Sequence, residues 1–328
     1  MNKIRVALCT ELFYPLYGGV ERRVYEMAER MHKFGADVIV LTSTSDYEGV
    51  LERSRVKQVS RCTLTIPPNR SLAFCIQYWF NTFRALMKED YDVIDANGHL
   101  AILPAAIASF LRRKPMVATI HDLYLGQWKQ MYTSRKSVFG LFMEMLTGLA
   151  AKQSNTVLTL NTSLKKRISR VFGISSSKIR IQRSGIDVEY IDKIKSGRKK
   201  KNLVIYVGRL VPQKNVSMLL RAFALIKDEN IELCVVGDGE ELESLKQLSI
   251  DLDISKKIVF TGKLRDYDDV LRKIKESTVL VLPSVRESFG IVPMEAMICY
   301  TPVISTHTEG PSDYIENGIN SFLVDSEA

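Results

Sequence analysis

The sequence predicts two doubly wound α/β domains, each built around a parallel sheet. At 328 residues the chain exceeds a typical single domain. Short β-branched runs alternate with amphipathic stretches along nearly the whole chain, which is the pattern of β-α-β units. This pattern pauses between Gly185 and Gly197 and then starts again, as expected for an interdomain connection. We therefore expect a first domain over residues 1–186 and a second over residues 187–328.

In the first domain, the predicted strands are short apolar runs: Ile4–Cys9, Ala36–Thr42, Asp92–Asp95, Met116–Ile120 and Thr156–Leu160. A helix is predicted over Val20–Phe34, where Val24, Ala28 and Met31 have helical spacing. The stretch from Glu48 to Pro68 is irregular and is assigned no element.

The second domain repeats the scheme. Its predicted strands are Leu203–Val207, Glu232–Val236, Lys257–Thr261, Val279–Leu282 and Pro302–Ser305. Ligands of such sheets bind beyond the carboxyl ends of the strands, so functional residues are expected directly after each strand.

The composition is that of a soluble globular protein, with 46% hydrophobic and 25% charged residues. The longest apolar run, Leu100 to Leu111, is shorter than the roughly 20 residues of a membrane-spanning helix. The N-terminus lacks the uninterrupted apolar stretch of a signal peptide. We expect a cytoplasmic protein with reduced thiols, because its cysteines are widely spaced without a C-x-x-C pair. They are Cys9, Cys62, Cys75, Cys234 and Cys299.

Positive charge is concentrated in the first domain. Residues 1–186 hold 27 Lys and Arg against 14 Asp and Glu, a net charge of +13, whereas the remaining residues have a net charge of −4. Such asymmetry suggests an anionic partner, namely a membrane surface, a phosphorylated acceptor or nucleic acid. A solvated basic surface explains it equally well.

Two features of the first domain follow predicted strands. Gly18 and Gly19 open a helix, whose N-terminal amides could bind a phosphate, although adjacent glycines also suit a plain turn. His121 follows the fourth strand, where a turn-capping histidine is the commoner case. The G-x-G-x-x-G of a nicotinamide dehydrogenase is absent, and the histidines show no metal-binding spacing, so no metal is expected.

In the second domain, cations and glycines follow the strands. Arg209 comes directly after Gly208, and Lys214 lies shortly beyond, where a diphosphate would gain charge as its bond to a sugar breaks. Gly237 and Gly239 follow the next strand and allow close backbone approach, although a lone G-x-G is a weak signal.

The most informative segment runs from Pro283 to Ala296. Glu287 is predicted in the loop after a strand, and Glu295 about two turns into the following helix. Between them lies the helix start, Phe289, Gly290, Ile291 and Val292, with backbone amides free to bind an anion. This arrangement suits a sugar hydroxyl, a diphosphate and a ribose diol, in that order.

These motifs together resemble glycosyltransferase family 4, the retaining enzymes of GT-B fold. The resemblance covers nearly the whole chain in the expected order. It rests on Gly18-Gly19, Ile120-His121-Asp122, Ser184–Asp187, Gly208-Arg209 with Lys214, Gly237-Asp238-Gly239 and the segment from Glu287 to Glu295. It implies two Rossmann-like domains facing a cleft, the first binding the acceptor and the second the nucleotide-diphosphate sugar.

The resemblance also implies roles. Glu295 would bind the ribose, Glu287 the donor sugar, and Arg209 with Lys214 the departing diphosphate, assisted by amides near Gly290 and Gly19. His121 would contact the donor sugar. Transfer would retain the anomeric configuration without a covalent enzyme intermediate, and no cofactor or metal is expected.

Two departures from the family pattern are visible. Glu309-Gly310 stands where the family commonly has Gly-Gly, and the sequence ends before the closing C-terminal helices such enzymes usually carry, which indicates a truncated second domain.

The acceptor is predicted from an aromatic and basic stretch. Leu72–Met87 is flanked by Arg70 and Lys88, contains Arg84, and carries Phe74, Tyr78, Trp79, Phe80 and Phe83; Trp128–Met145 is a second such stretch. We hypothesise that the first domain docks on the inner face of an anionic membrane and glycosylates a lipid-linked or polyprenyl-phosphate acceptor. Ordinary core helices explain the same residues about as well.

Two other functions compete with the transferase. One is a sugar-nucleotide epimerase of the same fold. The other is a non-catalytic module that binds a sugar nucleotide or nucleic acid, but no nucleic-acid recognition motif accompanies the basic charge, so no nucleic acid is expected.

Overall fold

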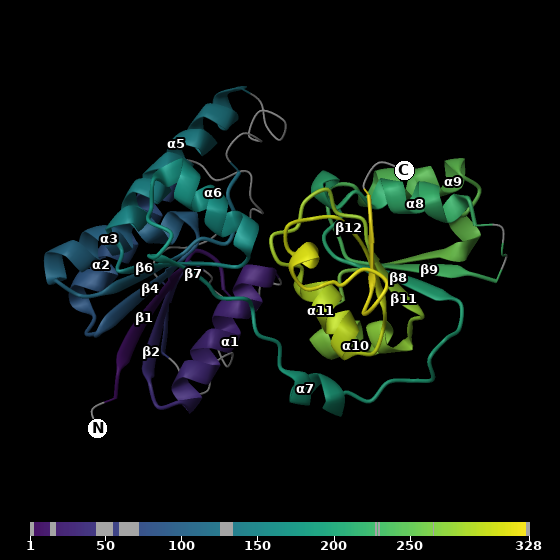
Figure 1. The fold of residues 1–328 in the computed structure, drawn as a ribbon, viewed down its shortest axis with the longest axis horizontal. Coiled ribbons are helices and arrows are strands. Elements are labelled where there is room, and N and C mark those ends of the chain that lie inside the picture. The colour runs from purple at the N-terminus through teal and green to yellow at the C-terminus, as the bar shows by residue number, and fades with distance from the viewer. Residues whose placement is uncertain are drawn as a thin grey trace. The chain divides into compact units, whose positions relative to one another are not determined.

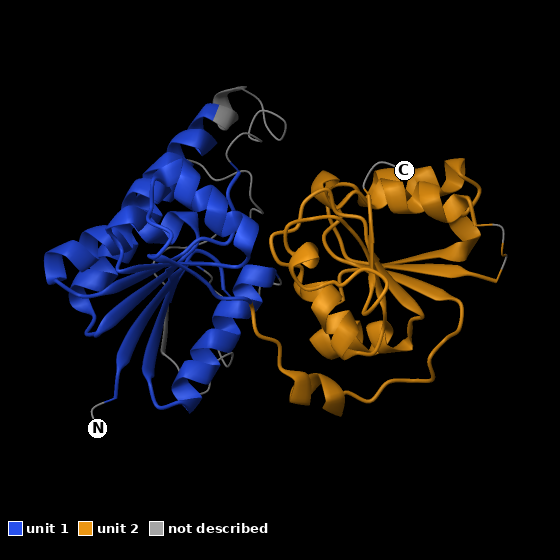
Figure 2. Cartoon of the chain, viewed as in Figure 1, with its two compact units in different colours: residues 1–183 blue, residues 184–328 orange. Residues whose placement is uncertain are grey.

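A computed structural model describes residues 3–13, 18–43, 55–58, 72–124, 134–226, 228, 230–264 and 266–325. The chain forms two compact units, Met1–Arg183 (unit 1) and Ser184–Ala328 (unit 2), shown in Figure 2. The boundary expected from the sequence falls three residues later, after residue 186. Each unit consists of a parallel sheet covered by helices (Figure 1).

Unit 1 contains seven strands within its described residues, in the spatial order β3-β2-β1-β4-β5-β6-β7, and all neighbours are parallel. The strands are β1 (Arg5–Thr10), β2 (Asp37–Thr42), β3 (Arg55–Gln58), β4 (Val93–Asn97), β5 (Met116–Thr119), β6 (Thr156–Thr159) and β7 (Ile179–Ile181). The helices are α1 (Gly19–Lys33), α2 (Leu72–Lys88), α3 (His99–Arg112), α5 (Ser134–Gln153) and α6 (Thr162–Phe172).

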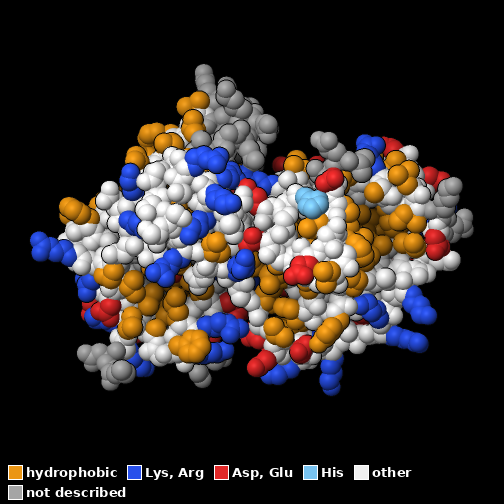
Figure 3. All heavy atoms as spheres, viewed as in Figure 1, with side chains coloured by type: hydrophobic (Ala, Val, Ile, Leu, Met, Phe, Trp, Pro, Cys, Tyr) orange, Lys and Arg blue, Asp and Glu red, His pale blue; other side chains and the backbone are white. Residues whose placement is uncertain are grey.

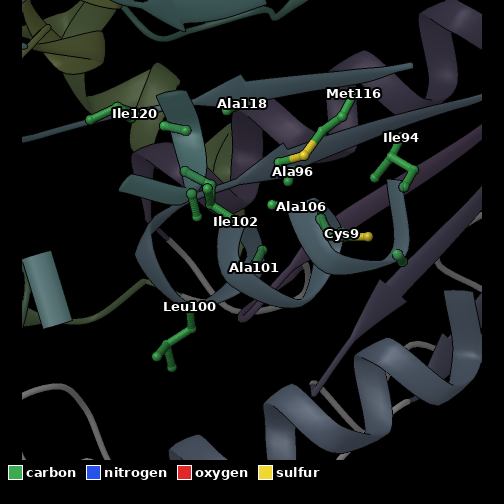
Figure 4. Close-up of a cluster of buried hydrophobic side chains, with 14 of the residues drawn as sticks. Cys9, Ile94, Ala96, Leu100, Ala101, Ile102, Ala106, Met116, Ala118 and Ile120 are labelled. Carbon is green, nitrogen blue, oxygen red and sulfur yellow. The ribbon is translucent and has the colours of Figure 1, made fainter. Parts of the chain in front are cut away.

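Strands β1, β2, β4 and β5 of unit 1 are mostly buried on both faces, which is why they read as apolar runs. Alternate residues of β1 point to opposite faces: Leu8 packs with α1, whereas Cys9 packs in the larger cluster with α2, α3 and α5. Figure 4 shows part of this cluster, to which Ile94 and Met116 contribute from the strands and Ile102 and Ala106 from α3.

Unit 2 has six parallel strands in its described part, in the order β10-β9-β8-β11-β12-β13. They are β8 (Leu203–Val207), β9 (Glu232–Val236), β10 (Ile258–Gly262), β11 (Val279–Leu282), β12 (Val303–Thr306) and β13 (Phe322–Val324). The helices are α7 (Val188–Lys193), α8 (Val216–Ala224), α9 (Leu242–Asp251), α10 (Tyr267–Glu276) and α11 (Ile291–Ile298), with short 3-10 turns η1 (Pro212–Lys214), η2 (Ser255–Lys257) and η3 (Pro311–Asp313).

Both sheets have the same point of reversal. In unit 1 the chain moves outward from β1 to β2 and β3, then returns to place β4 on the other side of β1. In unit 2, β9 and β11 flank β8 in the same way. In this architecture, ligands usually bind where the loops after two such strands diverge, at the carboxyl edge of the sheet.

The aromatic stretch of α2 packs mainly inward, which corrects the expectation that its aromatic residues would dock on a membrane. Tyr78 is buried, and Phe74, Trp79 and Phe83 pack against the core. Only Phe80 among the five is strongly exposed. Arg70 and the part of the second stretch from Trp128 to Ser137 lie outside the residues whose side chains are described.

The described part of the chain has no helix of sufficient length and apolar character to cross a bilayer. Four cysteines, Cys9, Cys75, Cys234 and Cys299, are buried free thiols. Cys62 lies outside the described residues.

Candidate active site

The loop after β8 is tied to the loop after β9. The Gly208 amide donates to the carbonyl oxygen of Val236 at 3.0 Å, and the Leu210 amide donates to that of Asp238 at 2.9 Å. The Tyr206 hydroxyl donates to the carbonyl oxygen of Arg209 at 2.9 Å. These bonds fix the backbone at Arg209 while its side chain stays exposed.

Gly237 and Gly239 are required by this close approach. Gly237 has φ of 141°, and a Cβ there would lie 1.8 Å from the carbonyl oxygen of Gly208. A Cβ at Gly239 would lie 2.2 Å from the carbonyl oxygen of Leu210. Backbone packing therefore accounts for both glycines, and their predicted contact with the donor stays a prediction.

Lys214 and Glu287, 73 residues apart, form an ion pair between Nζ and Oε2. Their side chains are 15% and 18% exposed. Hydrogen bonds hold the two loops together: the Val285 amide donates to the Gln213 carbonyl oxygen at 3.0 Å, and Gln213 Nε2 donates to that of Arg286 at 3.2 Å. The structure thus places Lys214 against Glu287, whereas no ion pair is found for Arg209 within the described residues.

The start of α11 presents backbone amides beside this ion pair. Gly290 precedes the helix with φ of 76°, a conformation that favours glycine, and no described side chain caps the helix. A Cβ at Gly290 would lie 3.2 Å from Glu287 Cγ, so the helix start and Glu287 are in close proximity. Val292 packs against the core, which leaves the amides of Ile291 and Val292 as the groups able to meet a ligand.

Glu295 lies in the second turn of α11, as predicted, but it is more buried than an open cleft residue would be. Its exposed fraction is 4%, and Oε1 accepts a hydrogen bond of 2.6 Å from the Tyr267 hydroxyl. Tyr267 in turn stacks on Tyr190 of α7, with ring centroids 6.3 Å apart. Tyr267 was not predicted, because nothing in the sequence near residue 267 marks it as a partner of residue 295.

Glu309-Gly310 stands in place of the usual glycine pair, and the structure shows that Gly310 is the position that requires glycine. A Cβ at this position would come within 2.5 Å of the Phe289 backbone, and its amide donates to the Glu287 carbonyl oxygen at 2.8 Å. Phe289 is 5% exposed and its ring lies 5.9 Å from that of Tyr314. Only the first position of the usual glycine pair is changed, to Glu309, and the position that packing requires remains glycine.

Tyr206 and Tyr314 line the same edge as neutral hydrogen-bond donors. Burial, reinforced by the nearby Glu287 carboxylate, raises the pKa of each phenol well above its ordinary value. The Tyr314 hydroxyl donates to the Gly290 carbonyl oxygen at 2.8 Å and so braces the helix start.

In unit 1, Gly18 and Gly19 lie at the N-terminus of α1. Gly18 is the N-cap, and a Cβ there would lie 2.1 Å from Glu21 Oε2, so a carboxylate rests against this helix end. An anion at this position is favoured by the helix dipole. Gly19 is exposed, and the preceding residues 14–17 lie outside the described part.

His121 lies just beyond β5 and is 8% exposed. Neither of its ring nitrogens has a hydrogen-bond partner among the described residues. Burial lowers the pKa of its imidazole to about 3, and the nearby Arg23 and His99 contribute to the lowering. His121 is therefore a neutral group with one donor and one acceptor available to a ligand.

A buried polar cluster near His121 was not predicted. On β4, Asp95 Oδ1 accepts hydrogen bonds from Asn97 Nδ2 at 3.0 Å and from Thr119 Oγ1 at 3.3 Å. Burial raises the pKa of Asp95 to about 6, against the opposing effect of Arg23 on α1. These residues lie on elements adjacent in the sheet but distant in sequence, which is why local patterns do not show the cluster.

Two parallel-sheet units, the second with cations, helix-end amides and acidic side chains after its strands, are the arrangement of a GT-B glycosyltransferase. A family model described as "Glycosyltransferase Family 4" matches residues 17–190, and one described as "Glycosyl transferases group 1" matches residues 187–328. The chain belongs to glycosyltransferase family 4, and it is a glycosyltransferase.

Individual relatives agree with this assignment. An uncharacterized glycosyltransferase of Methanocaldococcus jannaschii is 27% identical over 98% of this chain and 85% of its own length. The Escherichia coli UDP-Gal:alpha-D-GlcNAc-diphosphoundecaprenol alpha-1,3-galactosyltransferase is 27% identical over 80% of this chain and 69% of its own.

Solved structures share the fold. Sucrose-phosphate synthase from Thermosynechococcus elongatus superposes with a TM-score of 0.80 at 20% identity, covering 99% of this chain and 87% of that one. The Anabaena protein HepE in complex with UDP and glucose gives a TM-score of 0.76 at 20% identity, covering 98% and 86%. These similarities establish the GT-B fold of two Rossmann-like domains.

Proposed function

We propose that this glycosyltransferase moves a sugar from a nucleoside diphosphate sugar to a lipid-linked acceptor, with retention at the anomeric carbon. The observation that carries the donor part is the group at the edge of unit 2. There the uncapped start of α11, the Lys214–Glu287 pair and the exposed Arg209 belong to neighbouring loops. Cations and amides on neighbouring loops suit a diphosphate, whose charge grows as its bond to the sugar breaks.

Each residue has a proposed role. Arg209 and Lys214 stabilise the departing diphosphate together with the amides of Ile291 and Val292. When the Lys214 ammonium group binds the diphosphate, its ion pair with Glu287 weakens. Glu287 can then accept hydrogen bonds from the donor sugar. Glu295, held by Tyr267, accepts from the ribose hydroxyls. The same groups neutralise the leaving group, so no metal or cofactor is required in this scheme.

His121 is proposed to contact the donor sugar as a neutral imidazole. Two buried ring nitrogens without described partners carry a desolvation cost that sugar hydroxyls would offset. Gly18 and Gly19 are proposed to assist the diphosphate through the N-terminal amides of α1.

The lipid-linked acceptor is supported by relatives. The Escherichia coli enzyme named above acts on a diphosphoundecaprenol-linked sugar, and an O-antigen chain mannosyltransferase of Salmonella typhimurium is 25% identical over 61% of this chain. We propose a cytoplasmic enzyme that works at the inner membrane surface, in synthesis of a cell-surface glycan or glycoprotein.

A transfer assay tests the proposal. The purified chain is incubated with a panel of nucleoside diphosphate sugars and polyprenyl-diphosphate-linked acceptors, and the anomeric configuration of the product is read by NMR. We expect product only with a lipid-linked acceptor, with the donor's configuration retained. An inverted product would contradict the stereochemistry, and transfer only to soluble acceptors would contradict the acceptor class.

The same assay separates the other functions. An epimerase would convert the donor with no acceptor present. A nucleic-acid-binding module would be indifferent to Glu295→Ala, whereas the transferase should lose both transfer and nucleotide affinity.

A further inference from the structure

Helices α2, α3 and α5 lie on one face of the unit 1 sheet, with α3 packed against both neighbours. Their inward residues form the main core, but their outward side also carries large apolar side chains. Exposed residues among them include Leu72, Ile76 and Phe80 on α2, Ile107, Phe110 and Leu111 on α3, and Val138, Leu141, Phe142, Met145 and Leu149 on α5. We call these eleven residues the apolar face.

Helix α5 shows most clearly that this face is unusual. Met143, Ala150 and Ala151 on its inner side are buried in the core. Its exposed apolar residues recur at helical spacing on the opposite side, and Phe142 is 57% and Leu149 60% exposed. A surface helix of a soluble protein normally has a polar outer side, so a helix apolar on both sides calls for a second covering surface.

The charges on these three helices are almost all positive. Their sequences contain six basic residues, Arg84, Lys88, Arg112, Arg135, Lys136 and Lys152. The single acidic residue, Glu144, is 1% exposed and accepts a hydrogen bond from the Tyr124 amide. On the other face of the sheet, α1 is of mixed charge, with three glutamates beside four Arg and Lys residues. Figure 3 shows hydrophobic side chains along the outer edge of α5 with Lys and Arg side chains nearby.

A hollow at the C-terminal end of α3 combines both properties. It has a volume of about 650 Å³, and its lining includes Phe110, Leu111, Arg113 and Lys114. Apolar surface bordered by cations matches a bilayer leaflet, in which acyl chains lie beneath anionic phosphates.

We propose that the apolar face docks on an anionic lipid bilayer, with α5 lying in the interface and the surrounding cations at the level of the headgroup phosphates. Of the five aromatic residues of α2 that were predicted to dock, only Phe80 belongs to the apolar face, because Phe74, Tyr78, Trp79 and Phe83 pack in or against the core. Lipid is favoured over a protein partner because the apolar face spreads over three helices. None of the described side chains of these helices is an exposed acidic group.

Vesicle binding tests the proposal without donor or acceptor, so its failure would leave the proposed transfer reaction standing. The full chain is mixed with phosphatidylcholine vesicles, with and without phosphatidylglycerol, and bound protein is measured by sedimentation. We expect binding only to phosphatidylglycerol vesicles, weakening as salt is added. The double variant Leu141→Glu with Phe142→Glu should bind at least about tenfold more weakly.

A matched control lies in unit 2. Leu225 and Ile250 are 81% and 59% exposed, and the double variant Leu225→Glu with Ile250→Glu should bind vesicles like the unaltered protein. The pair Arg84→Gln with Lys88→Gln should weaken binding by about fivefold per charge. Circular dichroism and nucleotide titration verify that each variant is folded.

Three results would overturn the proposal. The first is no binding of the unaltered chain to phosphatidylglycerol vesicles at low salt. The second is equal binding by the α5 double variant and the unaltered chain. The third is a dimer in sedimentation velocity that the α5 variant dissociates, without vesicle binding, because it would assign the apolar face to a second copy of the chain.

Discussion

The ion pair between Lys214 and Glu287 gives opposite predictions for its two members. Both side chains are more than four-fifths buried, so removing one charge leaves the other poorly compensated. Lys214→Gln leaves a carboxylate at the proposed diphosphate site, which repels the ligand. Glu287→Gln frees the ammonium group of Lys214 for the diphosphate. A hydrogen bond to a charged group contributes about 1.5–3 kcal/mol, which corresponds to about tenfold to a hundredfold in affinity.

We therefore expect Lys214→Gln to weaken, and Glu287→Gln to tighten, the binding of a nucleoside diphosphate without its sugar, measured by isothermal titration calorimetry. Both should lower the rate of transfer, because Glu287 is proposed to orient the sugar. Lys246→Gln, which breaks an exposed pair with Glu243, serves as the control. A shift of the affinity in the same direction in both variants, or no change in either, would contradict the proposed role of this ion pair.

Other predictions concern packing, pH and the support of Glu295. Gly237→Ala should lower the free energy of unfolding by about 2 kcal/mol or more, from strain and the clash with Gly208, whereas Gly185→Ala, with no atom within 4 Å of its Cβ, should be nearly neutral in thermal unfolding. Burial raises the pKa of Asp95 from 3.8 to about 6, so as pH rises Asp95 ionises in the unfolded chain before it does in the folded one. The free energy of unfolding therefore falls between pH 3.8 and about 6. Asp95→Asn should abolish this fall and raise the free energy of unfolding at pH 7 by up to about 3 kcal/mol in urea titrations. The pKa of His121 is lowered from 6.5 to about 3, so the stability that its neutral imidazole provides is lost as pH falls through that range. His121→Gln should therefore lose less stability in acid, and an unchanged loss would contradict a buried, neutral His121. Tyr267→Phe removes the donor to Glu295 and should weaken nucleotide binding about tenfold, whereas Tyr190→Phe should have little effect; equal effects would show that the bond to Glu295 is not what matters.

The central strands could be predicted from sequence, but the sheet edges could not. The ten predicted strands agree with the structure within two residues at each end, because buried parallel strands are continuous apolar runs. Strand β7 has three residues, two of them exposed, so it gives no apolar signal. The six-residue helix α7 was also missed. It depends on Lys275, whose Nζ donates to the carbonyl oxygens of Ile191 at 2.6 Å and Ile194 at 2.8 Å from a distant part of the chain.

In the candidate site, too, some features could be predicted from the sequence and others could not. The positions of Arg209, Glu287 and the helix start at Ile291 followed from strand ends and helix signals, since these are local. The contacts that set their chemistry are not local. Lys214 meets Glu287 across 73 residues, and Tyr267 meets Glu295 across 28, so both depend on the order of strands in the sheet.

The most direct test of the donor site is a crystal structure of the chain with a nucleoside diphosphate sugar bound. We expect diphosphate oxygens within hydrogen-bonding distance of the Ile291 and Val292 amides and of Lys214 Nζ, with the ribose against Glu295. A diphosphate bound elsewhere, with the start of α11 unoccupied, would contradict it.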